Sequence, residues 1–178
     1  MHILRAALGG LSLCLPSAAS AYVDGPVADR DGGGDFTCRE CHVHDESLAA
    51  AGSISVEGFP ARFEPGHTYA LTLHLTHPDM KRAGFQMSVR GETGTQAGDL
   101  AAGESVKIAA DPKSGVIFAQ HSENGAPFVE NHTAAWSVTW TAPEDSATVT
   151  VYAAGNASNG DDSALGDVIL LLSRTIKK

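Results

Sequence analysis

The sequence predicts an all-β fold, an antiparallel β-sandwich, on the basis of three observations. Apolar and polar residues alternate over several short stretches, as in strands that bury one face. Residues that favour turns, mainly Gly, Pro, Asn and Asp, separate these stretches. No stretch has the periodicity of a long helix. We therefore expect roughly seven or eight short strands in two packed sheets.

The predicted strands begin at residue 53. Leu71, Leu73 and Leu75 share one face of the clearest strand, with polar residues between them. Trp136 and Trp140 have the same parity on a later strand, and we expect both in the core. The predicted strands cover residues 53–57, 69–76, 85–90, 105–109, 115–121, 136–140, 149–151 and 168–173.

Two stretches differ from this alternating pattern. Residues 168–173 form a near-continuous apolar run, which predicts a strand covered on both faces. Residues 91–103 are polar and predict a loop.

Residues 1–21 have the pattern of a secretory leader. An apolar run too short to span a bilayer precedes Ala19-Ser20-Ala21, a cleavage site of the A-x-A type before Tyr22. Leu13 precedes Cys14, which argues against a lipoprotein anchor. We expect a periplasmic or extracellular protein with no membrane insertion after cleavage. Its parts would be a haem-attachment segment at 22–52 and a β-sandwich at 53–178.

The segment Cys38-Arg39-Glu40-Cys41-His42 reads C-x-x-C-H, the attachment signature of c-type haem. Two thiols this close can each form a thioether to one vinyl group of the same porphyrin, with the following imidazole at the iron. Cys38 and Cys41 are thus predicted to bind one covalent haem c, and His42 to be the proximal ligand. A redox disulfide or half of a zinc site are the alternatives. The disulfide would be expected in a thioredoxin-like βαβ context, and the zinc site would need a second pair of Cys or His ligands. Neither is visible in the sequence.

The motif is flanked by two kinds of segment. Residues 22–35 are rich in Gly and Asp, above all at 29–35, and predict a flexible lead-in. The motif itself is expected on a short helical turn, which residues 45–51 would continue.

The formal net charge of −9 argues against nucleic acid or anionic membranes as partners. It would suit a basic redox partner protein, and it is equally the charge of many secreted proteins.

Four segments of the β-region carry a family resemblance. They are F-E-P-G-H-T-Y at 63–69, R-A-G-F-Q at 82–86, W-T-A-P at 140–143 and Y-A-A-G-N-A-S-N-G-D at 152–161. With them, the chain resembles bacterial reelin-like secreted domains of the choice-of-anchor V type, over about residues 35–175. The resemblance implies a reelin-like, immunoglobulin-like β-sandwich. Members of that family often carry a C-x-x-C-H segment ahead of the sandwich, as here.

Several residues are candidates for the distal iron ligand. His132 is the first choice, because relatives have a similar Val-Glu-His-Thr stretch there, although Asn131 is inserted in this chain. His121, at the end of a predicted strand, is the runner-up. His77 and Met80 follow, and the position can also be open or hold water. Three further residues are expected in the core or on the surface and not at the iron: Met87, His74 and His67.

His44 is a separate case, because it is only two residues from His42 and cannot reach the opposite face of the same ring. We expect it to contact a haem propionate or solvent. The alternative is that it ligates the haem of a neighbouring chain, which would build a dimer or filament.

The leading functional hypothesis is an exported monohaem c-type cytochrome that carries one electron between partners and is not an enzyme. A haem enzyme or gas sensor with an open distal site is one alternative. A structural, adhesive or self-assembling reelin-like module that contains haem is another. The acidic loop 156–162 is expected to be either a hydrogen-bonded turn or a cation site.

Overall fold

A computed structural model describes residues 22–34, 37–44, 46–126, 129 and 131–178 of the chain. The predicted leader, with Cys14, lies outside these residues. The elements in chain order are η1 (Cys38–Glu40), β1 (Val43–His44), α1 (Glu46–Ala49), β2 (Ser53–Glu57), β3 (Thr68–Thr76), β4 (Arg82–Gly91), β5 (Asp99–Ala102), β6 (Val106–Ala110), β7 (Ile117–His121), η2 (Glu123–Gly125), β8 (Thr133–Thr141), β9 (Thr148–Ser158) and β10 (Leu165–Lys177). In the described residues, no helix has the length and apolar character needed to cross a bilayer.

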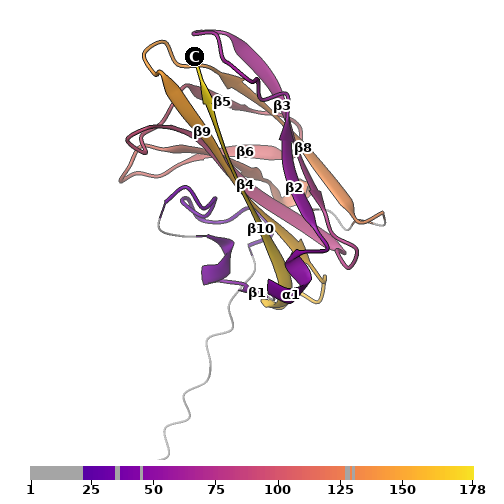
Figure 1. The fold of residues 1–178 in the computed structure, drawn as a ribbon. Coiled ribbons are helices and arrows are strands. Elements are labelled where there is room, and N and C mark those ends of the chain that lie inside the picture. Colours follow the sequence, from indigo (N-terminus) through magenta and orange to yellow (C-terminus); the bar gives the residue numbers. More distant parts are fainter. Residues whose placement is uncertain (1–21, 35–36, 45, 127–128, 130) are drawn as a thin grey trace, which may run out of the picture.

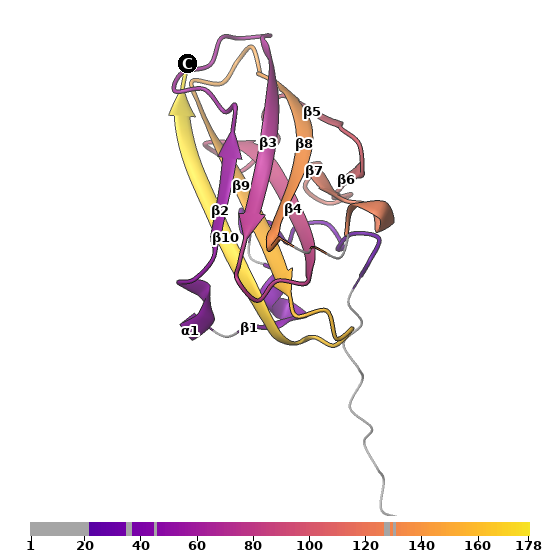
Figure 2. The same cartoon turned by 90° about the vertical axis from the view of Figure 1, so that its right-hand side faces the viewer.

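The strands form two sheets that pack face to face, as Figures 1 and 2 show from two sides. The larger sheet has the order β1-β10-β9-β4-β7-β6, and the smaller one has the order β2-β3-β8-β5. Neighbouring strands are antiparallel, except that β1 runs parallel to β10. The predicted all-β sandwich is therefore confirmed.

The core lies between the two sheets and consists of the predicted alternating rows. Leu71, Leu73 and Leu75 on β3 are at most 1 % exposed. Trp136 and Trp140 on β8 are also buried, and their indole N–H groups donate to the carbonyls of Gly125 and Ala97. Burying each such side chain contributes about 1.5–3 kcal/mol, which is the main term that holds the sheets together. The expected core row on β4 is also buried: Phe85, Met87 and Val89.

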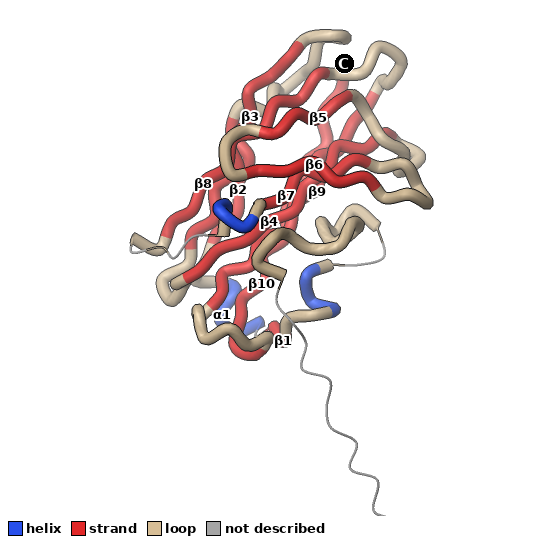
Figure 3. The backbone as a smooth tube through the Cα atoms, turned by 180° about the vertical axis from the view of Figure 1, so that it is seen from behind, coloured by secondary structure: helices blue, strands red, loops and turns tan. Residues whose placement is uncertain are grey.

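The outer face of β4 is buried as well, which the alternation did not predict. Gln86, Ser88 and Arg90 point away from the core, yet each is at most 5 % exposed. The chain between residues 22 and 34, here called the N-terminal segment, covers them. Figure 3 shows loop segments lying over this face of the larger sheet.

The N-terminal segment has no regular element, as expected, but it is bonded to the sheet rather than loose. The Arg30 N–H donates to Gln86 Oε1 at 2.5 Å, and Gln120 Nε2 donates to the Pro26 carbonyl at 3.0 Å. Gly33 runs so close to Tyr152 that an added Cβ would lie 2.8 Å from its ring. The expectation of a flexible lead-in is thus corrected over the described residues 22–34. Residue 35 lies outside them.

The other differences from the predicted strands have local causes. The predicted loop 91–103 contains β5, a short strand that pairs with β8 and buries only Leu100. The predicted strand 168–173 is part of the longer β10, which is covered on both faces only over residues 167–170. Of the predicted helical stretch 45–51, Glu46–Ala49 is helical, and Asp45 lies outside the described residues.

Candidate haem site

The C-x-x-C-H motif folds as a capped helical turn, as predicted. Thr37 caps η1, because its hydroxyl accepts from the Arg39 N–H at 3.1 Å and its own N–H donates to the Glu40 carboxylate. The N–H groups of Cys41 and His42 both donate to the Cys38 carbonyl, at 3.2 and 3.0 Å. This turn brings the motif's two thiols to the same side as its imidazole.

The residues after the motif join the larger sheet and fix its position. The Val43 N–H donates to the Ala164 carbonyl at 2.7 Å, and β1 pairs with the start of β10. Side chains reinforce this pairing, because His44 Nδ1 accepts from the Ile169 N–H at 2.9 Å. His42 therefore leaves a backbone that is bonded to the sheet on its C-terminal side.

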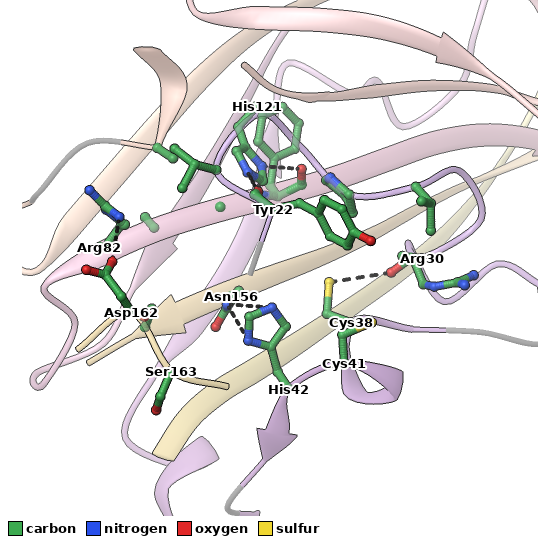
Figure 4. Close-up of a pocket in the computed structure, with 18 residues that line it drawn as sticks. Tyr22, Arg30, Cys38, Cys41, His42, Arg82, His121, Asn156, Asp162 and Ser163 are labelled. Atoms are coloured by element: carbon green, nitrogen blue, oxygen red, sulfur yellow. Dashed lines mark hydrogen bonds and ion pairs between the residues drawn. The ribbon is translucent and has the colours of Figure 1, made fainter. Parts of the chain in front are cut away.

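Both thiols and the His42 ring line one cavity of about 320 Å³, shown in Figure 4. This volume lies within the range of small-molecule and cofactor sites. The lining comes from the N-terminal segment, the motif, β4, β7 and the β9–β10 turn. The lining residues are Tyr22, Val23, Pro26, Val27, Arg30, Cys38, Cys41, His42, Arg82, Ala83, Gly84, Phe85, His121, Ala126, Asn156, Ser158, Asp162 and Ser163.

A buried carboxylate orients the His42 ring. His42 Nδ1 lies 2.5 Å from Oδ2 of Asp167, whose side chain is 1 % exposed. A carboxylate can only accept, so Nδ1 carries the proton. In a neutral ring Nε2 then has the lone pair, and Asn156 Nδ2 lies 3.4 Å from it. Asn156 Nδ2 also donates to Asp167 Oδ2, at 3.2 Å. A metal-binding histidine commonly has such a partner on its second nitrogen.

His121 lies on another wall of the same cavity, at the end of β7. Its Nδ1 accepts from the Phe85 N–H at 2.9 Å and lies 3.0 Å from the Phe85 carbonyl, and its Nε2 is 3.3 Å from the Tyr22 carbonyl. Burial lowers the pKa of His121 below its usual value, although these backbone hydrogen bonds act in the opposite direction. A neutral imidazole has the lone pair that iron requires. Gly84 makes room for the ring, because an added Cβ would lie 2.8 Å from His121 Cε1.

The other predicted distal residues do not line this cavity. His132, the first choice, has Nδ1 3.3 Å from the Met80 carbonyl. His77 is buried and has Nε2 3.1 Å from the Leu48 carbonyl, and the Met80 side chain is wholly buried in the core. His44 has partners within the chain on both ring nitrogens, since its Nε2 lies 3.2 Å from Arg39. The structure thus brings His121, and not His132, to the cavity that His42 lines.

The alternatives to haem at Cys38 and Cys41 find less support in the geometry. Both thiols are free rather than joined in a disulfide. Burial, together with the nearby charges of Glu40 and Asp31, raises the pKa of the Cys38 thiol to about 12. A zinc site would need more ligands. In the part of the chain that the structure describes, His, Cys, Asp and Glu do not gather in groups of three or more that could hold a metal ion.

The cavity fits a covalent haem in its donor set and its lining. It offers two thiols for the vinyl groups, an imidazole whose Nε2 has Asn156 Nδ2 3.4 Å away, and a largely apolar wall from the N-terminal segment. Arg30 and Arg82 also line it, and arginine suits the carboxylates of haem propionates. Asn156 Oδ1 is buried without a hydrogen-bond partner among the described residues. A group bound in the cavity could satisfy it.

The loop 156–162 forms a hydrogen-bonded turn. Asn159 Oδ1 accepts from the Asp161 N–H at 3.0 Å, and Asp161 Oδ1 accepts from the Ser163 N–H at 2.9 Å. Hydrogen bonds to its carboxylate lower the pKa of Asp161, the Ser163 backbone bond having the largest effect. The hydrogen-bonded turn is therefore present, and a cation at this loop stays a prediction.

Sequence reasoning missed Asp167 and Asn156. A signal for Asp167 does exist, because it is the one charge immediately before the apolar run 168–172. A carboxylate carried into such a buried strand needs a partner. For Asn156 the sequence holds no comparable signal.

Comparison with known proteins identifies the fold. No protein-family model matches this sequence, and no curated protein matches it either. Among solved structures, the human F-spondin reeler domain is similar with a TM-score of 0.50 and 19 % identity, over 72 % of this chain and 89 % of that one. The Reelin-N domain of F-spondin is similar with a TM-score of 0.53 and 18 % identity, over 79 % and 94 %. The chain is therefore a two-sheet β-sandwich with the fold of a reeler domain.

Proposed function

We propose that this chain is an exported monohaem c-type cytochrome that transfers single electrons. The observation that carries the proposal is that Cys38, Cys41 and His42 line one largely apolar cavity together with His121. A local sequence motif and a cavity made by residues from distant strands thus coincide. A chance C-x-x-C-H segment on a surface loop would not need such a cavity beside it.

Each residue has a separate role in this proposal. Cys38 and Cys41 would hold the haem by thioethers, which keep it on the protein outside the cytoplasm. His42 would bind the iron through Nε2. When bound, the haem supplies a centre that accepts and releases one electron. The apolar wall would lower the dielectric around this centre, and no side chain has to transfer a proton.

We propose His121, the runner-up from sequence, as the distal ligand in place of His132. In the structure the Phe85 N–H donates to Nδ1, so Nε2 carries the proton and faces the Tyr22 carbonyl. Binding iron through Nε2 would require the proton to move to Nδ1, toward the Phe85 carbonyl, and the contacts with the Phe85 N–H and the Tyr22 carbonyl to be given up. Two histidine ligands favour electron transfer, because they leave no open position for a substrate or gas. A basic redox protein remains the expected partner for a chain of net charge −9.

Expression in a host that attaches haem c tests the proposal. We expect the processed chain to carry one haem by intact mass, with a low-spin six-coordinate spectrum. Cys38→Ala and Cys41→Ala should each leave a single thioether, which shifts the pyridine haemochrome band, and the double variant should carry no covalent haem. Met87→Leu, a conservative change deep in the core, serves as the matched control and should keep both thioethers.

Three other outcomes would each contradict part of the proposal. A bare wild-type polypeptide, or one with Cys38 and Cys41 joined to each other, would exclude the cytochrome. Ready binding of carbon monoxide to the reduced protein would favour the haem enzyme or sensor. A haem protein that no soluble electron donor can reduce would favour the structural module.

A further inference from the structure

Asp167 is a buried charge whose position needs an explanation. It is 0 % exposed, at the point where β10 enters the sandwich. Asn156 Nδ2 and the Asn159 N–H donate to it at 3.2 and 3.3 Å, and His42 Nδ1 lies 2.5 Å from its Oδ2. Isolated burial of a carboxylate is very costly, so this side chain is held by the groups that surround it.

The strand pairing makes the contact between Asp167 and His42 a fixed one. β1 pairs with β10 so that His44, two residues after His42, is opposite Asp167. On the other side, β10 pairs with β9, which carries Asn156. The backbones of both partners are therefore bonded into the same sheet, and the imidazole cannot turn away without losing its proton acceptor.

A charged acceptor on Nδ1 changes the chemistry of Nε2. As the Nδ1 proton is drawn toward the carboxylate, the ring gains imidazolate character and Nε2 becomes a stronger electron donor. A stronger donor and a nearby negative charge both stabilise the oxidised iron more than the reduced iron. The hydrogen bond to a ligand's second nitrogen is thus one of the protein's means of setting a haem potential.

We infer that Asp167 is a positioning residue that fixes the orientation of the proximal His42 and holds the reduction potential of the haem low. The inference rests on the proposed function, because it requires haem at His42. It adds that the chain would accept electrons only from a donor of low potential.

Potentiometric titration of Asp167→Asn tests the inference. Asn keeps the shape and the acceptor oxygen but removes the charge. The ratio of reduced to oxidised protein at a fixed ambient potential should rise about tenfold or more, which is about 59 mV for one electron. The matched control is Asp162→Asn, which removes an equal charge from the cavity lining. Because the side chain of Asp162 is 80 % exposed, its loss should change the ratio by less than about threefold.

Electron paramagnetic resonance of the oxidised wild-type protein gives a second measurement, which does not depend on the variant folding. Its g-values should indicate an axial imidazole with imidazolate character, and in Asp167→Asn they should move toward neutral imidazole. Wild-type g-values of a neutral imidazole, or equal shifts of potential in both variants, would overturn the inference. Haem attached by two thioethers in those samples would leave the proposed cytochrome intact, so the two failures can be told apart.

Discussion

Arg90 pairs with Asp31 across the outer face of the larger sheet, with 2.8 Å between Nη2 and Oδ1. The contact joins the strand β4 to the N-terminal segment, and both residues are at most 5 % exposed. Ser88 donates to the same carboxylate and accepts from Arg90 Nε at 2.9 Å. Because Val27 and Arg30 of this segment line the cavity, the ion pair also holds one wall of the candidate haem site.

We expect Arg90→Met to lower the free energy of unfolding by about 3–5 kcal/mol, because it leaves the Asp31 carboxylate buried without its cation. Urea denaturation measures this loss, and limited proteolysis should show new cleavage between residues 22 and 34. Arg174→Met is the control, since Arg174 is an exposed arginine on β10, and it should cost about 1 kcal/mol or less. Equal losses in the two variants would mean that the segment is held by something other than this pair.

Optical spectra of two histidine variants test which residue is the distal ligand. We expect His121→Ala to convert the haem protein from six-coordinate low-spin to a form that binds carbon monoxide when reduced, because the cavity then lacks its second imidazole. His132→Ala should leave the spectrum unchanged, because His132 bonds to the Met80 carbonyl away from the cavity. The reverse pattern would restore the choice that the sequence alone favoured.

The strands with regular alternation could be predicted from sequence, because their signal is local. Leu71, Leu73 and Leu75 identify β3 without any knowledge of its neighbours. β5 lacks such a signal, since only Leu100 is buried and the strand exists through its pairing with β8. The N-terminal segment reads as a free loop because its partners, such as Gln86 and Arg90, are more than 50 positions away.

The candidate site also contains some residues that a local motif identifies and others that only the fold brings to it. Cys38, Cys41 and His42 are adjacent, so a motif identifies them. The residues that complete the site, Asp167 and His121, reach it through the pairing of β10 and through the end of β7. His121 and His132 both lie at strand ends, and only the packing of the sheets determines which of them meets the cavity.

The reactivity of Cys38 should depend on pH in an unusual way in protein made without haem attachment. In the folded Cys41→Ala variant, its pKa of about 12 leaves about 10⁻⁴ of the thiol ionised at pH 8. The rate of reaction with iodoacetamide should therefore rise about tenfold per pH unit from pH 7 to pH 10, without a plateau. The same chain in urea should reach a plateau above the ordinary thiol pKa of about 8.5. Cys38 is half-buried, and a plateau near pH 9 in the folded protein would show that its thiol is not desolvated enough to raise the pKa in this way.

Gly84 gives a test of the space around His121. An added Cβ there would lie 2.8 Å from His121 Cε1 and 3.1 Å from Nδ1, so Gly84→Ala must push the ring away from β4. We expect the variant to keep haem at His42 but to lose part of its low-spin spectrum, and to be less stable by about 1–3 kcal/mol. Gly91→Ala, on the same strand, is the control, because its nearest neighbour would lie 3.8 Å from the new Cβ. A full low-spin spectrum in Gly84→Ala would mean that His121 does not need its present position to bind the iron. If His121→Ala also kept the full low-spin spectrum, His121 would not be the distal ligand.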